Sequence, residues 1–192
     1  RVSLGGRKKK YFVVMLNIFP PGQSLQEVYD LKGATVGRRV EQREIQNFRV
    51  LKDLNLLENE RKVQLSSKDK DSLSGRIQDD VSFLALVQVI DYSLLVGICN
   101  KQREGGECPS KNNERFQSLF RFNGSKEYDY FIGIIDILTP WSLRKQLEHY
   151  LRGICIYRNR ISTVAPPKYA LRFLEFMETN LFSSENQSHS QE

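Results

Sequence analysis

The 192-residue sequence has little histidine, little cysteine and no long apolar run. Its two histidines are too few for a histidine-rich metal site. A Ser-His-Asp or Cys-His catalytic arrangement would have to use His149, because His189 lies in a polar tail. The three cysteines lack paired spacing, which predicts no disulfide framework or zinc site and fits a reducing setting. With no membrane-spanning stretch and no signal-peptide pattern, we expect a cytoplasmic protein whose membrane contact is peripheral.

The charge of the chain is unbalanced toward the basic side. Lysine and arginine number 29 against 23 acidic residues, which gives a net charge of +6. This excess predicts acidic partners: phospholipid headgroups, nucleotides or nucleic acid. Nucleic acid is disfavoured, because the basic residues are not interleaved with aromatic stacking platforms and form no known binding motif. Residues 1–10 hold five basic residues and no acid, and we treat them as a separate basic segment.

The hydrophobic pattern predicts an α+β fold with an antiparallel sheet and helices. Strands are predicted at residues 11–19, 89–98, 116–122 and 127–138. The last two are joined by Asn-Gly at residues 123–124, a strong hairpin signal. Helices are predicted at residues 75–89 and 140–153 and from residue 166 onward, with loops at residues 66–71 and 99–114. We expect residues 183–192, which are almost without apolar side chains, to be disordered.

Two aspartates stand in or beside apolar runs. Asp91 opens the run at residues 89–98, and Asp136 lies within the run at residues 130–138. A buried carboxylate costs on the order of several kcal/mol unless a cation, a metal or a reacting group faces it. The pair therefore suggests Mg²⁺ and phosphoryl transfer. The alternative for each aspartate is a strand-end or turn residue whose oxygens accept backbone N–H bonds.

Three segments, in the same order, resemble one family. YDLKGATVGR at residues 29–38, IDYSLLVGI at residues 90–98 and IIDIL at residues 134–138 resemble the DLKGS, MDYSLL and IIDIL segments of the phosphatidylinositol phosphate kinases. The resemblance covers residues 11–182 and implies the C-terminal lobe of such a kinase domain with a remnant of the N-terminal lobe. Residues 145–149 are closest to the type I branch, the phosphatidylinositol 4-phosphate 5-kinases, whereas residues 161–164 are more similar to type II.

The resemblance assigns roles to individual residues. Asp136 corresponds to the family's Mg²⁺ ligand, and Asp91 to a second active-site aspartate near the acceptor hydroxyl or a metal. Lys32 and Arg38 correspond to basic positions that face the phosphates of lipid or nucleotide, with Lys32 and Asp136 serving the bound ATP. Residues 153–165 resemble the loop that selects the lipid headgroup at an anionic membrane surface. Three further basic residues are expected to bind phosphate: Lys145, Arg158 and Arg160.

The resemblance leaves two functions open. The nucleotide-covering loop and the ATP-binding lysine would precede residue 1, so we expect very low turnover from these 192 residues alone. Ala34, Cys99 and Gln146 also depart from the family's usual serine, histidine and lysine. The first hypothesis is ATP-dependent phosphorylation of a phosphatidylinositol monophosphate, with the 4-phosphate at its 5-hydroxyl as the expected substrate. The second is a kinase-like, non-catalytic adaptor that binds phosphoinositide membranes and active kinases of the family.

Overall fold

The computed structural model describes residues 12–19, 25–41, 50–101, 119–124, 127–141 and 164–183. These residues form a five-stranded sheet in the order β2-β1-β3-β5-β4. Only β1 and β2 pair in parallel, and the other neighbours are antiparallel. The strands are β1 (Glu27–Leu31), β2 (Leu51–Lys52), β3 (Ser93–Asn100), β4 (Arg121–Asn123) and β5 (Tyr128–Ile135). The predicted α+β class with a largely antiparallel sheet is therefore confirmed, while the lobe assignment stays a prediction.

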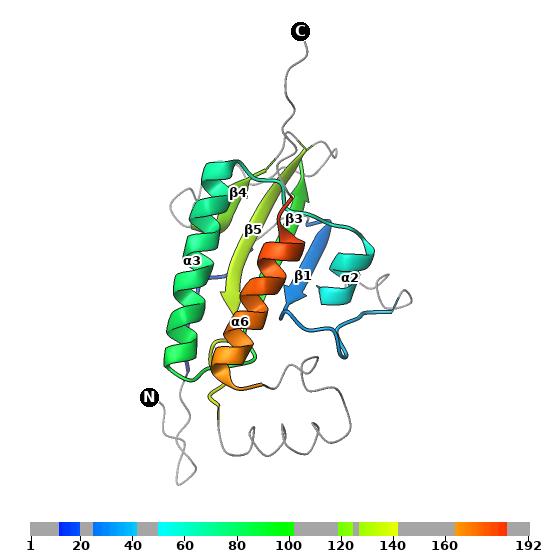
Figure 1. Ribbon diagram of the computed structural model, residues 1–192. Helices are drawn as coiled ribbons and strands as arrows, with labels where there is room; N and C mark the ends of the chain where they lie inside the picture. Colours follow the sequence, from blue (N-terminus) through cyan, green and yellow to red (C-terminus); the bar gives the residue numbers. More distant parts are fainter. Residues whose placement is uncertain are drawn as a thin grey trace, which may run out of the picture.

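Two long helices cover one face of the sheet. Helix α3 (Ser67–Leu86) and helix α6 (Pro166–Phe176) lie side by side across it, and the short helix α2 (Asp53–Glu58) lies near β1 (Figure 1). The chain continues from α6 into a π-helical turn, η3 (Met177–Leu181). Within the described ranges, no helix combines the length and the apolar character needed to cross a membrane.

Alternate residues of the central strands pack on opposite faces. Leu94, Val96 and Ile98 of β3 belong to the main core, together with the buried side chains of α3 and α6. Cys99 of β3 and Phe131 of β5 belong to a smaller cluster on the other face. This two-residue period is the expected consequence of strand geometry.

Helix α3 begins earlier than the pattern predicted. Ser66 is its N-cap and accepts a hydrogen bond from the backbone N–H of Asp69 at 3.1 Å. The predicted loop at residues 66–71 is therefore wrong, because a serine followed three residues later by an acid starts a helix as well as it fits a loop. The sequence predicts an apolar face of Ile77, Val81, Leu84 and Val87. The first three are buried, whereas Val87 is exposed, because α3 ends at Leu86.

The predicted strands shift at their ends. Residues 12–19 form no strand, and the predicted strand at residues 89–98 begins only at Ser93. The predicted hairpin is confirmed, because β4 and β5 pair antiparallel. The turn is longer than the predicted Asn-Gly pair, since Asn123 is the last residue of β4 and pairs with Asp129. Strand β5 ends at Ile135, three residues before the predicted end.

The last predicted helix is confirmed as α6, which starts at its two prolines and buries Tyr169 and Phe173 completely. The basic segment at residues 1–10, the predicted helix at 140–153, the loop at 153–165 and the tail beyond residue 183 fall outside, or almost outside, the described residues.

Candidate functional site

Three strand ends bring together the polar residues that the sequence singled out. β1 ends directly before Lys32, β5 ends directly before Asp136, and β3 begins two residues after Asp91. In the register of the sheet, Ser93 of β3 lies opposite Ile135 of β5. Because β1 and β5 both run antiparallel to β3, these ends meet at one edge of the sheet.

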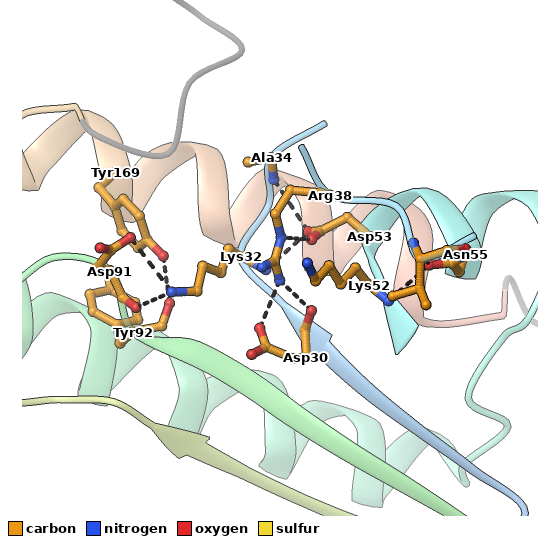
Figure 2. A network of polar contacts seen from close by, with 11 residues as sticks. Asp30, Lys32, Ala34, Arg38, Lys52, Asp53, Asn55, Asp91, Tyr92 and Tyr169 are labelled. Carbon is orange, nitrogen blue, oxygen red and sulfur yellow. Dashed lines mark hydrogen bonds and ion pairs between the residues drawn. The ribbon is translucent and has the colours of Figure 1, made fainter. Parts of the chain in front are cut away.

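Lys32, Asp91 and Asp136 line one cavity of about 310 Å³. The Lys32 ammonium donates a hydrogen bond to the backbone carbonyl of Asp91 at 2.7 Å, and its Nζ lies 3.5 Å from Oδ1 of the same residue (Figure 2). Lys32 and Asp91 are half-buried, whereas Asp136 is exposed. The remaining lining residues are Met15, Ile137, Leu138 and Thr139. The lining of the cavity thus includes two acidic residues and one basic residue.

Both aspartates have a left-handed backbone conformation. The φ angle is +70° at Asp91 and +62° at Asp136. Such a conformation is uncommon for a residue other than glycine, and aspartate is among the few that tolerate it. It turns Asp136 out of the sheet, so the prediction that this carboxylate lies inside a strand is wrong. The turn alternative holds for its position, and strained turns of this kind gather at functional sites.

The loop that carries Lys32 is held by a residue that the sequence analysis missed. Asp53 is fully buried, and its Oδ1 accepts hydrogen bonds from the backbone N–H of Lys32 at 2.9 Å and of Ala34 at 3.2 Å (Figure 2). The sequence around Asp53 gives little indication of this role, since an aspartate at the start of a helix usually only interacts favourably with the helix dipole.

Arg38 lies away from the cavity, between two carboxylates. Its Nε donates to Asp53 at 2.7 Å, and its Nη2 donates to Asp30 Oδ1 at 2.7 Å. Burial alone would lower the pKa of Arg38, but the charges of Asp53 and Asp30 and their hydrogen bonds outweigh it and raise the pKa. The structure therefore does not bring Arg38 together with the three cavity residues, and its phosphate contact stays a prediction.

Helix α6 fixes the turn that contains Asp91. The Tyr169 hydroxyl donates to the backbone carbonyl of Tyr92 at 2.5 Å, and the two rings meet edge to face at 4.7 Å. Burial, with a smaller contribution from the charge of Asp91, raises the pKa of Tyr169, so the phenol keeps its proton at neutral pH. This contact links the residue after Asp91 to a rigid element.

We expect Tyr169→Phe to lower the free energy of unfolding by about 1–2 kcal/mol, because it leaves the buried Tyr92 carbonyl without this donor. Tyr92→Phe is the matched control. The Tyr92 hydroxyl is buried and has no hydrogen-bond partner among the described residues, so its removal should change stability by less than about 0.5 kcal/mol or increase it. Urea unfolding of both variants measures the difference. Equal losses would show that the Tyr169 hydroxyl contributes nothing specific.

The donor set at the cavity fits Mg²⁺ in one particular way. Among the described residues, no group of three or more histidine, cysteine, aspartate or glutamate side chains could hold a metal ion. Mg²⁺ commonly binds one or two carboxylates and completes its shell with water and substrate phosphates. Asp136 and Asp91 meet that requirement. The other predicted phosphate ligands, Lys145, Arg158 and Arg160, lie outside the described residues.

Comparison with known proteins gives consistent matches. The family model described as phosphatidylinositol-4-phosphate 5-kinase matches residues 1–121 and 109–180. A probable phosphatidylinositol phosphate kinase of Dictyostelium discoideum is 29% identical over 93% of this chain and 34% of its own. The phosphatidylinositol 4-phosphate 5-kinase of Plasmodium falciparum is 30% identical over 93% and 12%. Human phosphatidylinositol 5-phosphate 4-kinase type-2 beta is 30% identical over 89% and 53%. The chain thus spans about half or less of these relatives.

Proposed function

This chain belongs to the phosphatidylinositol-4-phosphate 5-kinase family, and we propose that it supplies the phosphoryl-transfer site of a lipid kinase. The reaction is transfer of the γ-phosphate of ATP to a ring hydroxyl of a phosphatidylinositol monophosphate. The observation that supports this proposal is the meeting of Lys32, Asp91 and Asp136 in one cavity. An ammonium beside two carboxylates suits positioning and charge stabilisation, which supply most of the catalysis in phosphoryl transfer.

Each cavity residue has a role that fits its surroundings. Asp136 is exposed and presents a carboxylate that can bind a hard cation, with Asp91 as the second oxygen donor. Mg²⁺ held there would neutralise the charge that spreads over the transferred phosphoryl group. The Asp91 carboxylate can also accept the proton of the attacking inositol hydroxyl and so orient it. Lys32, fixed by the Asp91 carbonyl, offers a point charge to a phosphate oxygen.

The expected substrate is phosphatidylinositol 4-phosphate, phosphorylated at its 5-hydroxyl. The type I resemblance at residues 145–149 supports this choice, while the type II resemblance at residues 161–164 makes the 5-phosphate the competing substrate. Lys145, Arg158 and Arg160 are proposed to bind the headgroup. Basic residues near an anionic surface contribute about 1 kcal/mol each, so we expect a weak, peripheral attachment to the cytoplasmic leaflet.

The test is transfer of labelled γ-phosphate from ATP and Mg²⁺ to liposomes that contain either monophosphate. Both this chain and an N-terminally extended form are assayed, because the relatives are longer. The proposal predicts a labelled bisphosphate from at least the extended form. Failure of both forms, with headgroup-dependent liposome binding retained, would contradict it and favour the non-catalytic adaptor.

A further inference from the structure

Asp53 joins the start of α2 to the segment at residues 32–38, which lies 15 to 21 residues earlier in the sequence. It is the first residue of α2, and its side chain is completely buried. Its Oδ1 accepts from the backbone N–H groups of Lys32 and Ala34, and its Oδ2 accepts from Arg38 Nε. The two amides flank Gly33, so one carboxylate oxygen closes the turn that directly follows β1. Lys32 is the first residue of that turn.

Only a carboxylate satisfies all three donors. Its two oxygens accept and never donate, which matches two N–H groups on one side and a guanidinium on the other. The Arg38 charge offsets the cost of burying the anion, and Asp30 completes the set of acceptors around that guanidinium. Asn at position 53 would have nearly the same shape, but its amide would point N–H groups at Arg38 or at the loop. The fit is therefore one of hydrogen-bond polarity rather than of size.

The fixed turn determines where the Lys32 ammonium can reach. The Lys32 backbone is held by Asp53 at 2.9 Å, and its Nζ is held by the Asp91 carbonyl at 2.7 Å. Lys32 thus reaches from the buried Asp53 to Asp91 and is held at its backbone and at its Nζ (Figure 2). If the backbone tether is lost, only the contacts with Asp91 hold the Nζ at the cavity. Those contacts then work against the entropy that the long lysine side chain gains when it leaves.

We propose that Asp53 is a positioning residue of the transfer site, acting through Lys32. The proposal rests on the function proposed above, in which Lys32 binds a phosphate oxygen. A positioning role distinguishes Asp53 from a buried aspartate that only forms ion pairs. The chain contains one such aspartate, which serves as a comparison. Asp129 is also completely buried and is paired with Lys101 at 2.8 Å and Arg121 at 2.6 Å. It lies opposite Cys99, at the end of β3 far from the cavity.

A double-mutant cycle on the rate of transfer tests the coupling. The variants are made in whichever protein transfers phosphate, this chain or the N-terminally extended form. We expect Asp53→Asn to lower kcat about 10-fold and Lys32→Met to lower it about 100-fold. The double variant should match Lys32→Met within about two-fold, because a misplaced lysine and an absent one are equivalent. Asp129→Asn should leave kcat nearly unchanged. If the Asp53→Asn factor multiplies fully onto that of Lys32→Met, the role of Asp53 is structural and the proposal fails.

Hydrogen exchange gives a second readout that does not depend on activity. The amides of Lys32 and Ala34 should exchange about 10-fold faster in Asp53→Asn than in the wild type, and at the wild-type rate in Asp129→Asn. Should Asp53→Asn not fold, Asp53→Ser, which keeps one acceptor, replaces it. Unchanged exchange at both amides would overturn the proposal. A wild-type protein that transfers no phosphate refutes the proposed function instead, and exchange then still decides whether Asp53 holds the loop.

Discussion

Asp136→Asn should lower kcat for phosphate transfer about 100- to 1000-fold, the range seen when one preorganised charge-stabilising group is removed. Asparagine keeps the shape of the side chain and tolerates the left-handed backbone at this position, where φ is +62°. The change therefore removes one negative charge and little else. Because the side chain is exposed, the free energy of unfolding should stay within about 0.5 kcal/mol of wild type.

The control for this variant is Asp71→Asn. Asp71 is an exposed aspartate on α3, away from the cavity. Its substitution by asparagine changes the net charge of the protein by the same amount as Asp136→Asn does. Transfer by Asp71→Asn should equal wild type. Measuring kcat over a range of Mg²⁺ concentrations adds a second criterion, because Asp136→Asn should also need more Mg²⁺ to reach half of its own maximum. Wild-type rates in Asp136→Asn would remove Asp136 from the proposed site.

The cavity residues could be predicted from the sequence because short motifs carry their identity. Lys32, Asp91 and Asp136 each stand in a motif, and the pairing of the strands then brings them together. What the motifs could not give is the backbone at Asp136. The apolar run continues to Leu138, so periodicity extends the strand, and only the left-handed turn ends it at Ile135.

Asp53 and the run at residues 12–19 show the other limit of sequence reasoning. The partners of Asp53 lie 15 to 21 residues away, so no local pattern announces them. The run at residues 12–19 has the β-branched, apolar composition of a strand, and yet no described strand pairs with it. Strand formation depends on a neighbour as much as on propensity. Both cases depend on contacts between residues far apart in the sequence, which composition and motif spacing do not predict.

Gly33→Ala should be the most destabilising small substitution in the motif that carries Lys32. Gly33 has φ of +63°, and a Cβ there would lie 2.9 Å from Phe173 Cα and 3.0 Å from the Arg172 carbonyl oxygen. Both are backbone atoms of α6, which cannot move aside as a flexible side chain would. We expect a loss of about 3 kcal/mol in the free energy of unfolding, the sum of left-handed strain and overpacking.

Gly37→Ala separates these two causes. Gly37 has nearly the same φ, +67°, but a Cβ there would meet nothing within 4 Å. It should therefore lose only about 1 kcal/mol, the cost of the backbone conformation alone. Urea unfolding of the two variants gives the difference in the free energy of unfolding directly. That difference measures how closely the Lys32 loop packs against α6.

Tyr169 of the same helix also holds the turn after Asp91. A large difference would therefore mean that α6 sets the separation of Lys32 and Asp91. In that case phosphate transfer should fall with stability in Gly33→Ala but not in Gly37→Ala. Equal losses of unfolding free energy in the two variants would show that the loop can shift away from the helix. In that case α6 would not position Lys32.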